Sequence, residues 1–580
     1  MLAILAVVSL APLSDVGAGG DRSPEAGLLD AAGELLAPVV PDAVPLPSEP
    51  AAALQRAVTG VASRLEMPVD AGAVLARAGL DPRLGGRLAL LLEDLAACQD
   101  ATARLLAALP APLATYLDDA VTAPPVPGAA AVRSCAARLQ AHGLELSRFL
   151  AGMPADMGSD VALWPVLRLD LDGSDDVVIH DYALSVDAGG NDTYLNNAGG
   201  NPLDLMRGPN GSVAPKKEPA RGCINPGFDL FAGECVLAAA LLVDVAGDDT
   251  YGHMQPPDVE ALCTDEPSVR RVMTTGAGFA GAGIFIEVDG DDRYLGKSVA
   301  QGAGHIGGVG VLWDEAGDDI YTAMRLSKGF GTVQGLGLLR DGGGNDRYDY
   351  YMPRPIDPGA PTKTPGSGGG FSAQGLCDNT PRWDEGTGLL GGIGLLVEAS
   401  GDDTYVAGPT LEHRLGTTEP LRQTGSLGFG DVAGFGYMHD LGGRDTYQGI
   451  SDRADDTTVM PTPEASGVFI DGSGKAARMR AAGGGATLMA AYSGHYLPGT
   501  ITVDGGTALQ FLNPDLFYRL EALGHTVTEI RADGGPPRFD SGLVEFGQAK
   551  EVVGAASLGT GRYDFYCEIH PFMRGVLTVR

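Results

Sequence analysis

The sequence predicts a multidomain, mainly β protein: an N-terminal α-helical segment, a central repeat β-solenoid and a C-terminal β-sandwich. Three observations carry this prediction. Apolar residues recur at three- and four-residue spacing in the first 160 residues, a Gly/Asp-rich motif returns seven times in the middle, and apolar and polar residues alternate near the end. The chain has 580 residues, too many for one ordinary hydrophobic core.

The charge balance restricts the partners of this chain. The formal net charge is −34, while 44% of the residues are hydrophobic and 20% are charged, as in folded proteins. An excess of negative charge repels polyanions, so nucleic acids and anionic membrane surfaces are not expected as partners. Cations, basic partners or simple solubility suit such a chain.

Residues 1–20 have features of a signal peptide. Leu2–Leu13 is apolar but too short to span a bilayer, and Val16-Gly17-Ala18 offers a cleavage site of small residues. A basic segment before the apolar run is missing, so a buried helix is the alternative. We expect export to the periplasm, the extracellular space or the cell surface, with no membrane span in the mature protein.

Residues 22–160 are predicted to be α-helical. Residues 87–109 and 130–150 carry apolar side chains at helical spacing, and Pro-rich breaks at 38–49 and 122–127 separate the helices. No catalytic or metal-binding pattern occurs here. We expect a small helical bundle that packs on, or caps, the region that follows.

Residues 165–450 contain the repeats of the predicted solenoid. The motif reads acid, two variable residues, Gly, usually Asp or Asn, Asp, one residue, Tyr. Its seven copies are DAGGNDTY (187–194), DVAGDDTY (244–251), EVDGDDRY (287–294), DEAGDDIY (314–321), DGGGNDRY (341–348), EASGDDTY (398–405) and DLGGRDTY (440–447). LDLDGSDDVVI at 169–179 reads as a degenerate copy.

The spacing of the copies predicts stacked rungs. Three adjacent copies start at 287, 314 and 341, a period of 27, and the wider intervals of 57, 43, 57 and 42 indicate rungs with inserted loops. A unit of this size cannot bury its own apolar face, so each rung must stack on the next. The equivalent tyrosines are then expected to form a ladder on one face.

The last Asp of each copy is a candidate calcium ligand. These residues are Asp192, Asp249, Asp292, Asp319, Asp346, Asp403 and Asp445. Their turns partly resemble the glycine-rich calcium-binding repeats of hemolysin-type toxins, which implies calcium between successive turns, held by carboxylate and carbonyl oxygens. The alternative is structural, with Asp and Asn side chains bonding backbone amides in tight turns.

Residues 451–483 are predicted to be a linker, and residues 484–580 to be strands. Apolar and polar residues alternate from about 484 onward, with a Gly-Gly turn at 505–506. Such a pattern over roughly a hundred residues is typical of a β-sandwich.

Four residues of the last region predict a copper site. FYCEIHPFMRGVLTV (565–579) places Cys567, His570 and Met573 on one loop, and LGHTVTEI offers His525 at the start of a strand. Thiolate and thioether ligands hold Cu(I), and imidazoles also suit Cu(II), so this set serves both states. No His-x-His pair occurs in the chain, which argues against a three-copper cluster.

Residues 485–580 resemble the cupredoxins, the type 1 blue copper proteins of the plastocyanin, pseudoazurin and amicyanin group. GHTV and GRYDFYCEIHPFMRGVLTV match two segments of that family, and the Cys-x-x-His-x-x-Met spacing is most similar to amicyanin. The resemblance implies one copper ion with His525, Cys567 and His570 as equatorial ligands and Met573 as the axial one. Nine residues separate Asp515 from His525, more than the family usually has.

The cysteine count fits export. Of seven cysteines, six are expected to pair as three disulfides, which leaves Cys567 for a metal. The six are Cys98, Cys135, Cys223, Cys235, Cys263 and Cys377.

The sequence therefore predicts an exported electron-transfer protein with one type 1 copper on a repeat scaffold, and no enzymatic activity. Its redox partner proteins are not identified, and Pro571 and Phe572 are expected to form an apolar docking patch beside His570. The alternative is a structural or adhesive surface protein whose Asp-rich repeats bind calcium or a partner, with the copper domain as an accessory. For a third class, an enzyme acting on polysaccharide, no carboxylate pair stands out from the repeats.

Overall fold

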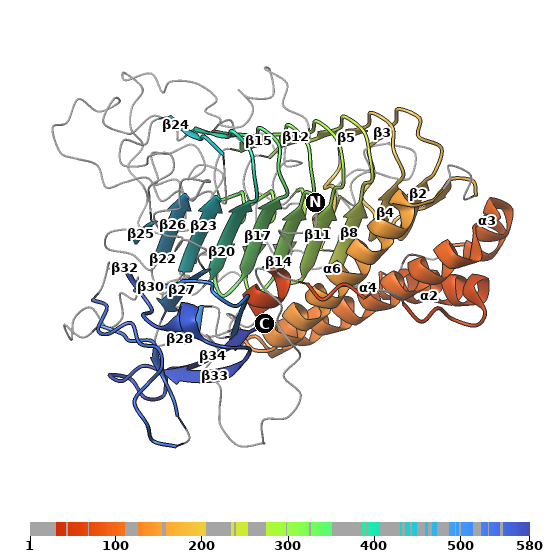
Figure 1. The fold of residues 1–580 in the computed structure, drawn as a ribbon. Coiled ribbons are helices and arrows are strands. Elements are labelled where there is room, and N and C mark those ends of the chain that lie inside the picture. The colour runs from red at the N-terminus through yellow and green to blue at the C-terminus, as the bar shows by residue number, and fades with distance from the viewer. Residues whose placement is uncertain are drawn as a thin grey trace.

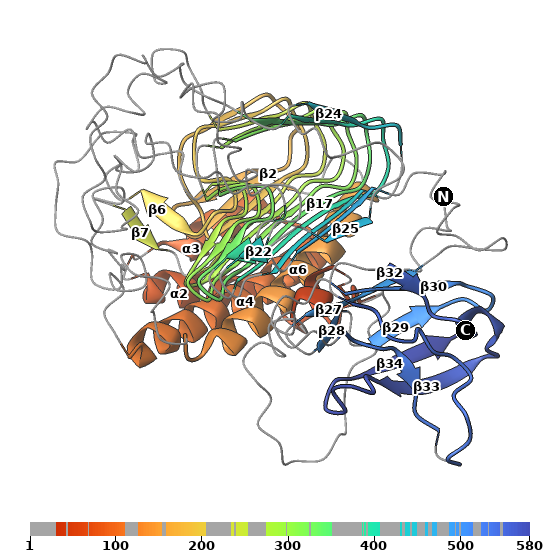
Figure 2. The same cartoon turned by 90° about the vertical axis from the view of Figure 1, so that its left-hand side faces the viewer.

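The structure is a computed structural model that describes residues 31–110, 126–153, 158–204, 234–252, 274–350, 386–406, 430–448, 459–471 and 487–580, with short gaps inside these ranges. It is mostly sheet, with several helices at the N-terminal side, and it is multidomain (Figures 1 and 2). The expected mainly β, multidomain class is confirmed. The predicted signal peptide lies outside the described residues. Within the described residues, no helix is both long and apolar enough to cross a membrane.

The N-terminal region is helical, as the apolar spacing predicts. Its helices are α2 (Pro50–Arg64), α3 (Ala71–Ala78), α4 (Pro82–Ala108) and α6 (Ala129–Ala151). Prolines begin α2 and α4, where a missing N–H costs nothing, and the Asp81 carboxylate caps α4 by accepting from the backbone N–H of Arg83 at 2.7 Å. Gly79 ends α3 in the left-handed conformation, with φ of 61°.

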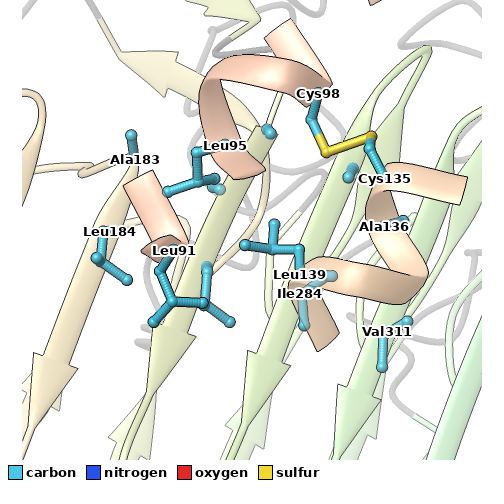
Figure 3. Packing of buried hydrophobic residues seen from close by; sticks show 14 of the residues in the cluster. Leu91, Leu95, Cys98, Cys135, Ala136, Leu139, Ala183, Leu184, Ile284 and Val311 are labelled. Carbon is cyan, nitrogen blue, oxygen red and sulfur yellow. A yellow bond between two sulfur atoms is a disulfide. The ribbon is translucent and has the colours of Figure 1, made fainter. Parts of the chain in front are cut away.

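Helices α4 and α6 lie along one face of a large sheet instead of capping its end, and α2 packs against α4 (Figure 1). Leu91, Leu95 and Leu139 face strand residues such as Ile284 and Val311 in one buried cluster (Figure 3). A disulfide between Cys98 and Cys135 joins α4 to α6. The other expected disulfide cysteines lie outside the residues whose side chains are described.

The middle of the chain forms three sheets in which successive repeats pair in parallel, here called the repeat stack (Figure 2). The largest sheet has 11 strands in the described residues, in the order β1 (Val161–Leu163), β2 (Leu167–Asp170), β4 (Leu184–Asp187), β8 (Ala239–Val243), β11 (Ala282–Ile286), β14 (Val309–Trp313), β17 (Leu336–Asp341), β20 (Ile393–Glu398), β23 (Phe435–Asp440), β26 (Gly467–Asp471), β25 (Val459–Pro461). Its pairings are parallel except for β1–β2 and β25–β26 at the two edges.

The other two sheets of the stack consist of short strands. The 5-stranded sheet contains β10 (Gly278–Phe279), β13 (Gly304–His305), β16 (Gly331–Thr332), β19 (Gly388–Leu389) and β22 (Gly430–Asp431). The 8-stranded sheet contains β24 (Thr446–Gln448), β21 (Thr404–Val406), β18 (Arg347–Tyr350), β15 (Ile320–Ala323), β12 (Arg293–Leu295), β9 (Thr250–Tyr251), β5 (Thr193–Tyr194) and β3 (Val177–Val178). A separate hairpin pairs β6 (Pro202–Asp204) with β7 (Glu234–Val236).

From β10 to β24, each repeat contributes one strand to each of the three sheets, and the pairing register follows the motif spacing. Val309 pairs with Leu336, 27 residues later, and Leu336 pairs with Ile393, so the longer intervals leave the register intact. The degenerate copy at 169–179 is also part of the stack, because β3 pairs with β5 and places Val178 beside Tyr194. Strand β26 extends the largest sheet into the segment expected to be a linker, where Val468, Phe469 and Ile470 form an apolar run.

The long insertions of the repeats occur in one connection, the one from the 8-stranded to the 5-stranded sheet, which forms one corner of the stack. The leading acid always precedes the motif tyrosine by seven residues, so the connection between the largest and the 8-stranded sheet has constant length. The connection from the 8-stranded to the 5-stranded sheet varies: β12 to β13 spans 296–303, whereas β18 to β19 spans 351–387. The interior of the stack is therefore the same from repeat to repeat.

Both faces of the largest sheet are buried, which explains its continuous apolar strands. On β14, Val309 and Val311 face the helices, while Leu312 packs in a second cluster with the motif tyrosines. This tyrosine ladder has ring centroids 4.7–5.1 Å apart and nearly parallel planes. Its members are Tyr194, Tyr251, Tyr294, Tyr321, Tyr348 and Tyr405.

The motif glycine is required by close stacking of the turns. Gly317 has a φ of +153°, and a Cβ added there would lie 1.7 Å from the carbonyl oxygen of Gly290 in the preceding repeat. Gly344 would meet the Gly317 oxygen at 1.5 Å. No side chain fits this position.

The C-terminal domain consists of two 4-stranded sheets around a separate core. One contains β28 (His495–Leu497), β27 (Thr487–Tyr492), β30 (Leu509–Leu512) and β32 (Ala549–Glu551); the other contains β29 (Thr500–Val503), β34 (Arg574–Val579), β33 (Gly561–Tyr566) and β31 (Thr528–Glu529). Phe511, Val527, Phe565 and Leu577 are fully buried between them. The long β33–β34 hairpin places the loop 567–573 at one end of the domain.

Candidate metal centre

The loop between β33 and β34 carries three of the four predicted copper ligands. The hairpin closes at the pair Tyr566 and Arg574, so the seven residues between them must form a tight loop. The Cys567 amide donates to the Met573 carbonyl at 3.1 Å, and the Met573 amide donates to the His570 carbonyl at 2.8 Å. These bonds fix the three residues relative to one another.

His525 reaches the same place from another segment. It precedes β31, which pairs antiparallel with β33 through Thr528 and Tyr566, and this register brings His525 toward Cys567. The His525 and Val544 backbones exchange hydrogen bonds of 3.0 and 2.8 Å, which hold the histidine in place. The insertion that precedes His525 in the sequence lies outside the described residues.

Three donor atoms converge on one point, here called the donor triangle. Cys567 Sγ lies 3.7 Å from Nδ1 of both His525 and His570, and the two nitrogens are 3.2 Å apart. A point equidistant from the three atoms is about 2.1 Å from each, within the range of metal bonds to histidine nitrogen and cysteine sulfur, about 2.0–2.3 Å. One sulfur and two imidazole nitrogens in a trigonal arrangement are the equatorial set that copper takes in electron-transfer sites.

The donor triangle is shielded from solvent. Cys567 and His525 are fully buried, His570 is 6% exposed and Met573 is 1% exposed. Met573 lies in the same core cluster as Cys567, at the other end of the loop. The structure thus brings three predicted ligands together and places the fourth beside them in the loop.

The surroundings of Cys567 favour its thiolate. Burial raises the pKa of the thiol, but hydrogen bonds with His525 and from backbone amides lower the pKa more, so it lies below its usual value. The Thr526 amide donates to Sγ at 3.4 Å, and the Thr526 hydroxyl accepts from the Glu568 amide at 2.9 Å. The thiolate is the form that binds metals.

Apolar side chains surround the one ligand close to the surface. Phe572 is 66% exposed and Ile569 is 38% exposed, although both are large hydrophobic residues. The Phe572 ring centroid lies 5.8 Å from that of His570, and Pro571 is exposed between them. The patch expected beside His570 therefore gains Ile569, which the sequence reasoning did not include.

The seven motif aspartates occupy a different part of the molecule, inside the repeat stack. Each accepts a hydrogen bond from the backbone amide of the equivalent Asp one repeat earlier, as Asp319 Oδ1 does from the Asp292 amide at 2.6 Å. The same bond recurs for Asp192, Asp249, Asp292, Asp346, Asp403 and Asp445. These bonds link neighbouring repeats, whereas the structural alternative expected bonds within one turn.

Sequence reasoning did not single out the leading acids of the motif. They are Asp187, Asp244, Glu287, Asp314, Asp341, Glu398 and Asp440, and each is at most 1% exposed. Except for Glu287, their second oxygens lie within hydrogen-bonding distance of the ladder hydroxyls: the Tyr321 hydroxyl lies 2.8 Å from Asp314 Oδ2 and 2.7 Å from Asp341 Oδ2, and it donates its one hydrogen between them. The available signal was an acid at this position in all seven copies.

Solved structures similar to this chain include cupredoxins, over about a sixth of its length. A purple cupredoxin from Nitrosopumilus maritimus is 23% identical, covering 16% of this chain and 98% of that one, with a TM-score of 0.13. Two reduced amicyanin variants are 25% and 27% identical, covering 16% and 17% of this chain and 82% and 85% of those, each with a TM-score of 0.14. No family model and no curated protein matches the chain. Because likeness at this TM-score is weak, the donor triangle carries the case for a metal centre.

Proposed function

We propose that this chain is an exported type 1 copper protein that transfers single electrons through one mononuclear blue copper site. The donor triangle carries the proposal, because its size and its chemical composition both suit copper. His525, Cys567 and His570 would hold the ion, and Met573 would be a further, weaker ligand. When bound, copper supplies a one-electron couple between Cu(I) and Cu(II).

The protein contributes a fixed and dry environment for that couple. The hairpin loop and the Val544 bridge hold the donors in one arrangement, so a change of oxidation state need not move them far. Burial excludes water from Cys567, and the Thr526 amide stabilises the negative charge on its sulfur. No substrate has to bind, so we propose no enzymatic activity.

The apolar rim of Ile569, Pro571 and Phe572 is proposed to receive redox partner proteins. His570 lies beside Phe572 of this rim and is the most exposed of the four ligands, so a partner bound here would come closest to the site at His570. The three sheets of the repeat stack are proposed to form one β-solenoid that acts as the scaffold. Periplasmic or extracellular placement is part of the same proposal, in keeping with the Cys98–Cys135 disulfide.

Copper titration of the full chain tests this function. We expect an intense visible band that saturates at one Cu(II) per chain, bleaches with a mild reductant and returns on oxidation. His570→Ala should abolish the band, whereas Glu568→Gln, an exposed change in the same loop, should leave it unchanged. A chain that folds and binds no copper would favour the alternative, a structural or adhesive surface protein.

A further inference from the structure

The interior of the repeat stack contains a row of buried acids, here called the carboxylate file, far from the donor triangle in the sequence. Its described centre consists of Glu287, Asp292, Asp314, Asp319, Asp341, Asp346 and Glu398, each at most 2% exposed. Carboxylate oxygens lie within 4.8 Å of one another in three overlapping sets: Glu287, Asp292 and Asp314; Asp314, Asp319 and Asp341; Asp341, Asp346 and Glu398. Each set joins both acids of one repeat to the leading acid of the next.

Several oxygens of this file have no amide or hydroxyl as hydrogen-bond partner. Glu287 Oε2, Asp319 Oδ2 and Asp346 Oδ2 are fully buried and accept no hydrogen bond from an amide or a hydroxyl, and the carboxyl groups of Glu287 and Asp319 are in hydrogen-bonding contact with the carboxyl group of Asp314. Within the described residues, no Lys or Arg side chain forms an ion pair with these three carboxylates. Burying a carboxylate without a partner or a counter-charge raises the free energy of the folded state. A positive charge bound within the file would lower it.

A comparison within the repeats shows that the second oxygen matters. The residue before each motif Asp forms a parallel ladder at the surface: Asn345 Oδ1 accepts from the Asp402 amide at 3.1 Å, and Asp318 Oδ1 from the Asn345 amide at 2.8 Å. Asn therefore suffices for such a ladder bond, and this outer position reads Asn, Asp, Asp, Asp, Asn, Asp, Arg. The inner position is Asp in all seven copies, although its ladder bond is also an amide-to-side-chain bond, accepted from the earlier repeat where the outer bond is accepted from the later one.

The protein itself places a cation at the beginning of the file. Arg168, on β2, donates to Asp187 Oδ2 at 2.7 Å and to Asp170 Oδ2 at 2.8 Å, and its side chain is only 9% exposed. Its guanidinium also lies 4.0 Å from Asp192 Oδ2. Both acids of the first complete repeat are thus neutralised by a buried positive charge, which the three sets further along do not receive from a described side chain.

We propose that the carboxylate file binds divalent cations of the calcium class, one in each set of three acids. An all-oxygen set selects a hard cation, and calcium accepts six to eight oxygens at about 2.3–2.6 Å in irregular geometry. Two oxygens on one calcium ion can be up to about 5 Å apart, which suits the 4.8 Å limit of the sets. The leading acids distinguish this site from one made by the motif aspartates alone.

Such cations would cross-link neighbouring repeats, since every set spans two of them. The site is independent of copper, because it shares no residue with the donor triangle.

Metal analysis and chelation of the full chain test the proposal. We expect more than one calcium ion per chain after exhaustive desalting, and a melting temperature of the repeat stack that falls by several degrees with a chelator and recovers with calcium. The chelation is performed on Cys567→Ala, so that removal of copper cannot cause the change. Terbium substituted for calcium should emit when tyrosine is excited, because the Tyr294 hydroxyl donates to Asp314 Oδ2 at 2.6 Å.

Two matched variants locate the effect. Asp319→Asn keeps an oxygen for the ladder bond but removes the second carboxylate oxygen, so it should lower the calcium count and weaken both the terbium emission and the response to chelator. Asp318→Asn changes the exposed neighbour in the same turn and should leave all three unchanged. Absence of calcium and of any chelator response in the parent chain, or equal effects of the two variants, would overturn the proposal. If Asp319→Asn does not fold, the parent measurements still decide it.

Discussion

The donor triangle and the carboxylate file both gather buried polar groups, but they are built in opposite ways. The triangle occurs once, contains soft donors, and draws its members from two segments 42 residues apart, His525 and Cys567. The file is repeated, contains only oxygen, and arises wherever one repeat stacks on the next. A single site depends on one strand pairing, whereas a periodic site depends on a register that many pairings share. Local changes should therefore abolish the first and only weaken the second.

The largest difference in effect between the two regions is expected for Cys567→Ala. In the proposed copper site its thiolate would be the source of the charge-transfer band, so the visible colour and the redox activity should disappear completely, while the melting transition of the repeat stack stays in place. Visible absorption and thermal unfolding on the same sample measure both. A variant that remains blue would show that Cys567 is not the ligand.

Two glycine substitutions compare how tightly the regions are packed. At Gly317→Ala the new Cβ would lie 1.7 Å from a backbone oxygen, so we expect a loss of about 3 kcal/mol in the free energy of unfolding. At Gly506→Ala, in the C-terminal domain, no atom lies within 4 Å and only the positive φ of 88° opposes the change, so about 1 kcal/mol is expected. Denaturant titration of each transition measures the two losses, and equal losses would contradict the close approach of the stacked turns.

The two regions should respond to pH with opposite signs. In the file, burial and the charge of Asp314 raise the pKa of Asp341 to about 7 and that of Asp292 to about 9. With cations removed, the protonated acids of the file contribute their full stabilisation of the folded state below about pH 4, the pKa range of unfolded carboxyls. This stabilisation is lost as pH rises through 7 to 9, where the folded acids lose their protons. The groups that face it are the other acids of the file, the tyrosine ladder and, at its first end, Arg168.

The C-terminal domain has the reverse dependence. Burial raises the pKa of Glu529, but its hydrogen bonds with Arg538 lower the pKa more, so the net shift is downward. The ionised Glu529 therefore contributes to the stability of the folded domain above the unfolded pKa of about 4.3, and this contribution is lost as pH falls further. Melting temperatures of the two transitions are measured from well below pH 4 up to pH 9 in chelator, and again with calcium. In chelator the repeat stack should lose stability as pH rises and the C-terminal domain as pH falls; curves that run parallel would contradict the prediction.

The smallest effect is expected at the weakest ligand. Met573→Leu keeps the buried volume and the donor triangle, so copper and colour should remain. In the proposed site the Met573 sulfur would donate electrons weakly to Cu(II), so its removal should raise the reduction potential. Protein-film voltammetry measures it, and loss of copper from this variant would show that Met573 is more than an axial ligand.

Much of the repeat stack follows from the sequence, because spacing alone defines it. The motif tyrosines at intervals of 57, 43, 27, 27 and 57 reappear as neighbours in one ladder, since Gly317 and its equivalents allow the turns to approach closely. The leading acids were harder to recognise. Glu287 and Asp292 are five residues apart, and only the bend between two sheets directs both side chains inward, where Asp314 of the next repeat joins them.

The donor triangle, too, can be predicted from the sequence only in part. Cys567, His570 and Met573 are close in sequence, so their spacing alone suggests a shared loop. The place of His525 depends on the pairing of β31 with β33, which no local pattern defines. Likewise, the apolar spacing predicts the helices but not which face of the stack they cover, because that depends on contacts such as Leu139 with the largest sheet.

The one variable corner of the repeats affects how this protein can evolve. The connection between the tyrosine strand and the short strand that follows has eight residues in one repeat and thirty-seven in another. The strands nevertheless pair in the same register. Doubling the length of a flexible loop costs only about 0.6 kcal/mol. A lineage can therefore lengthen, shorten or exchange whole segments at this edge while the buried acids and tyrosines stay as they are. New recognition surfaces can be acquired there one repeat at a time, without a new fold.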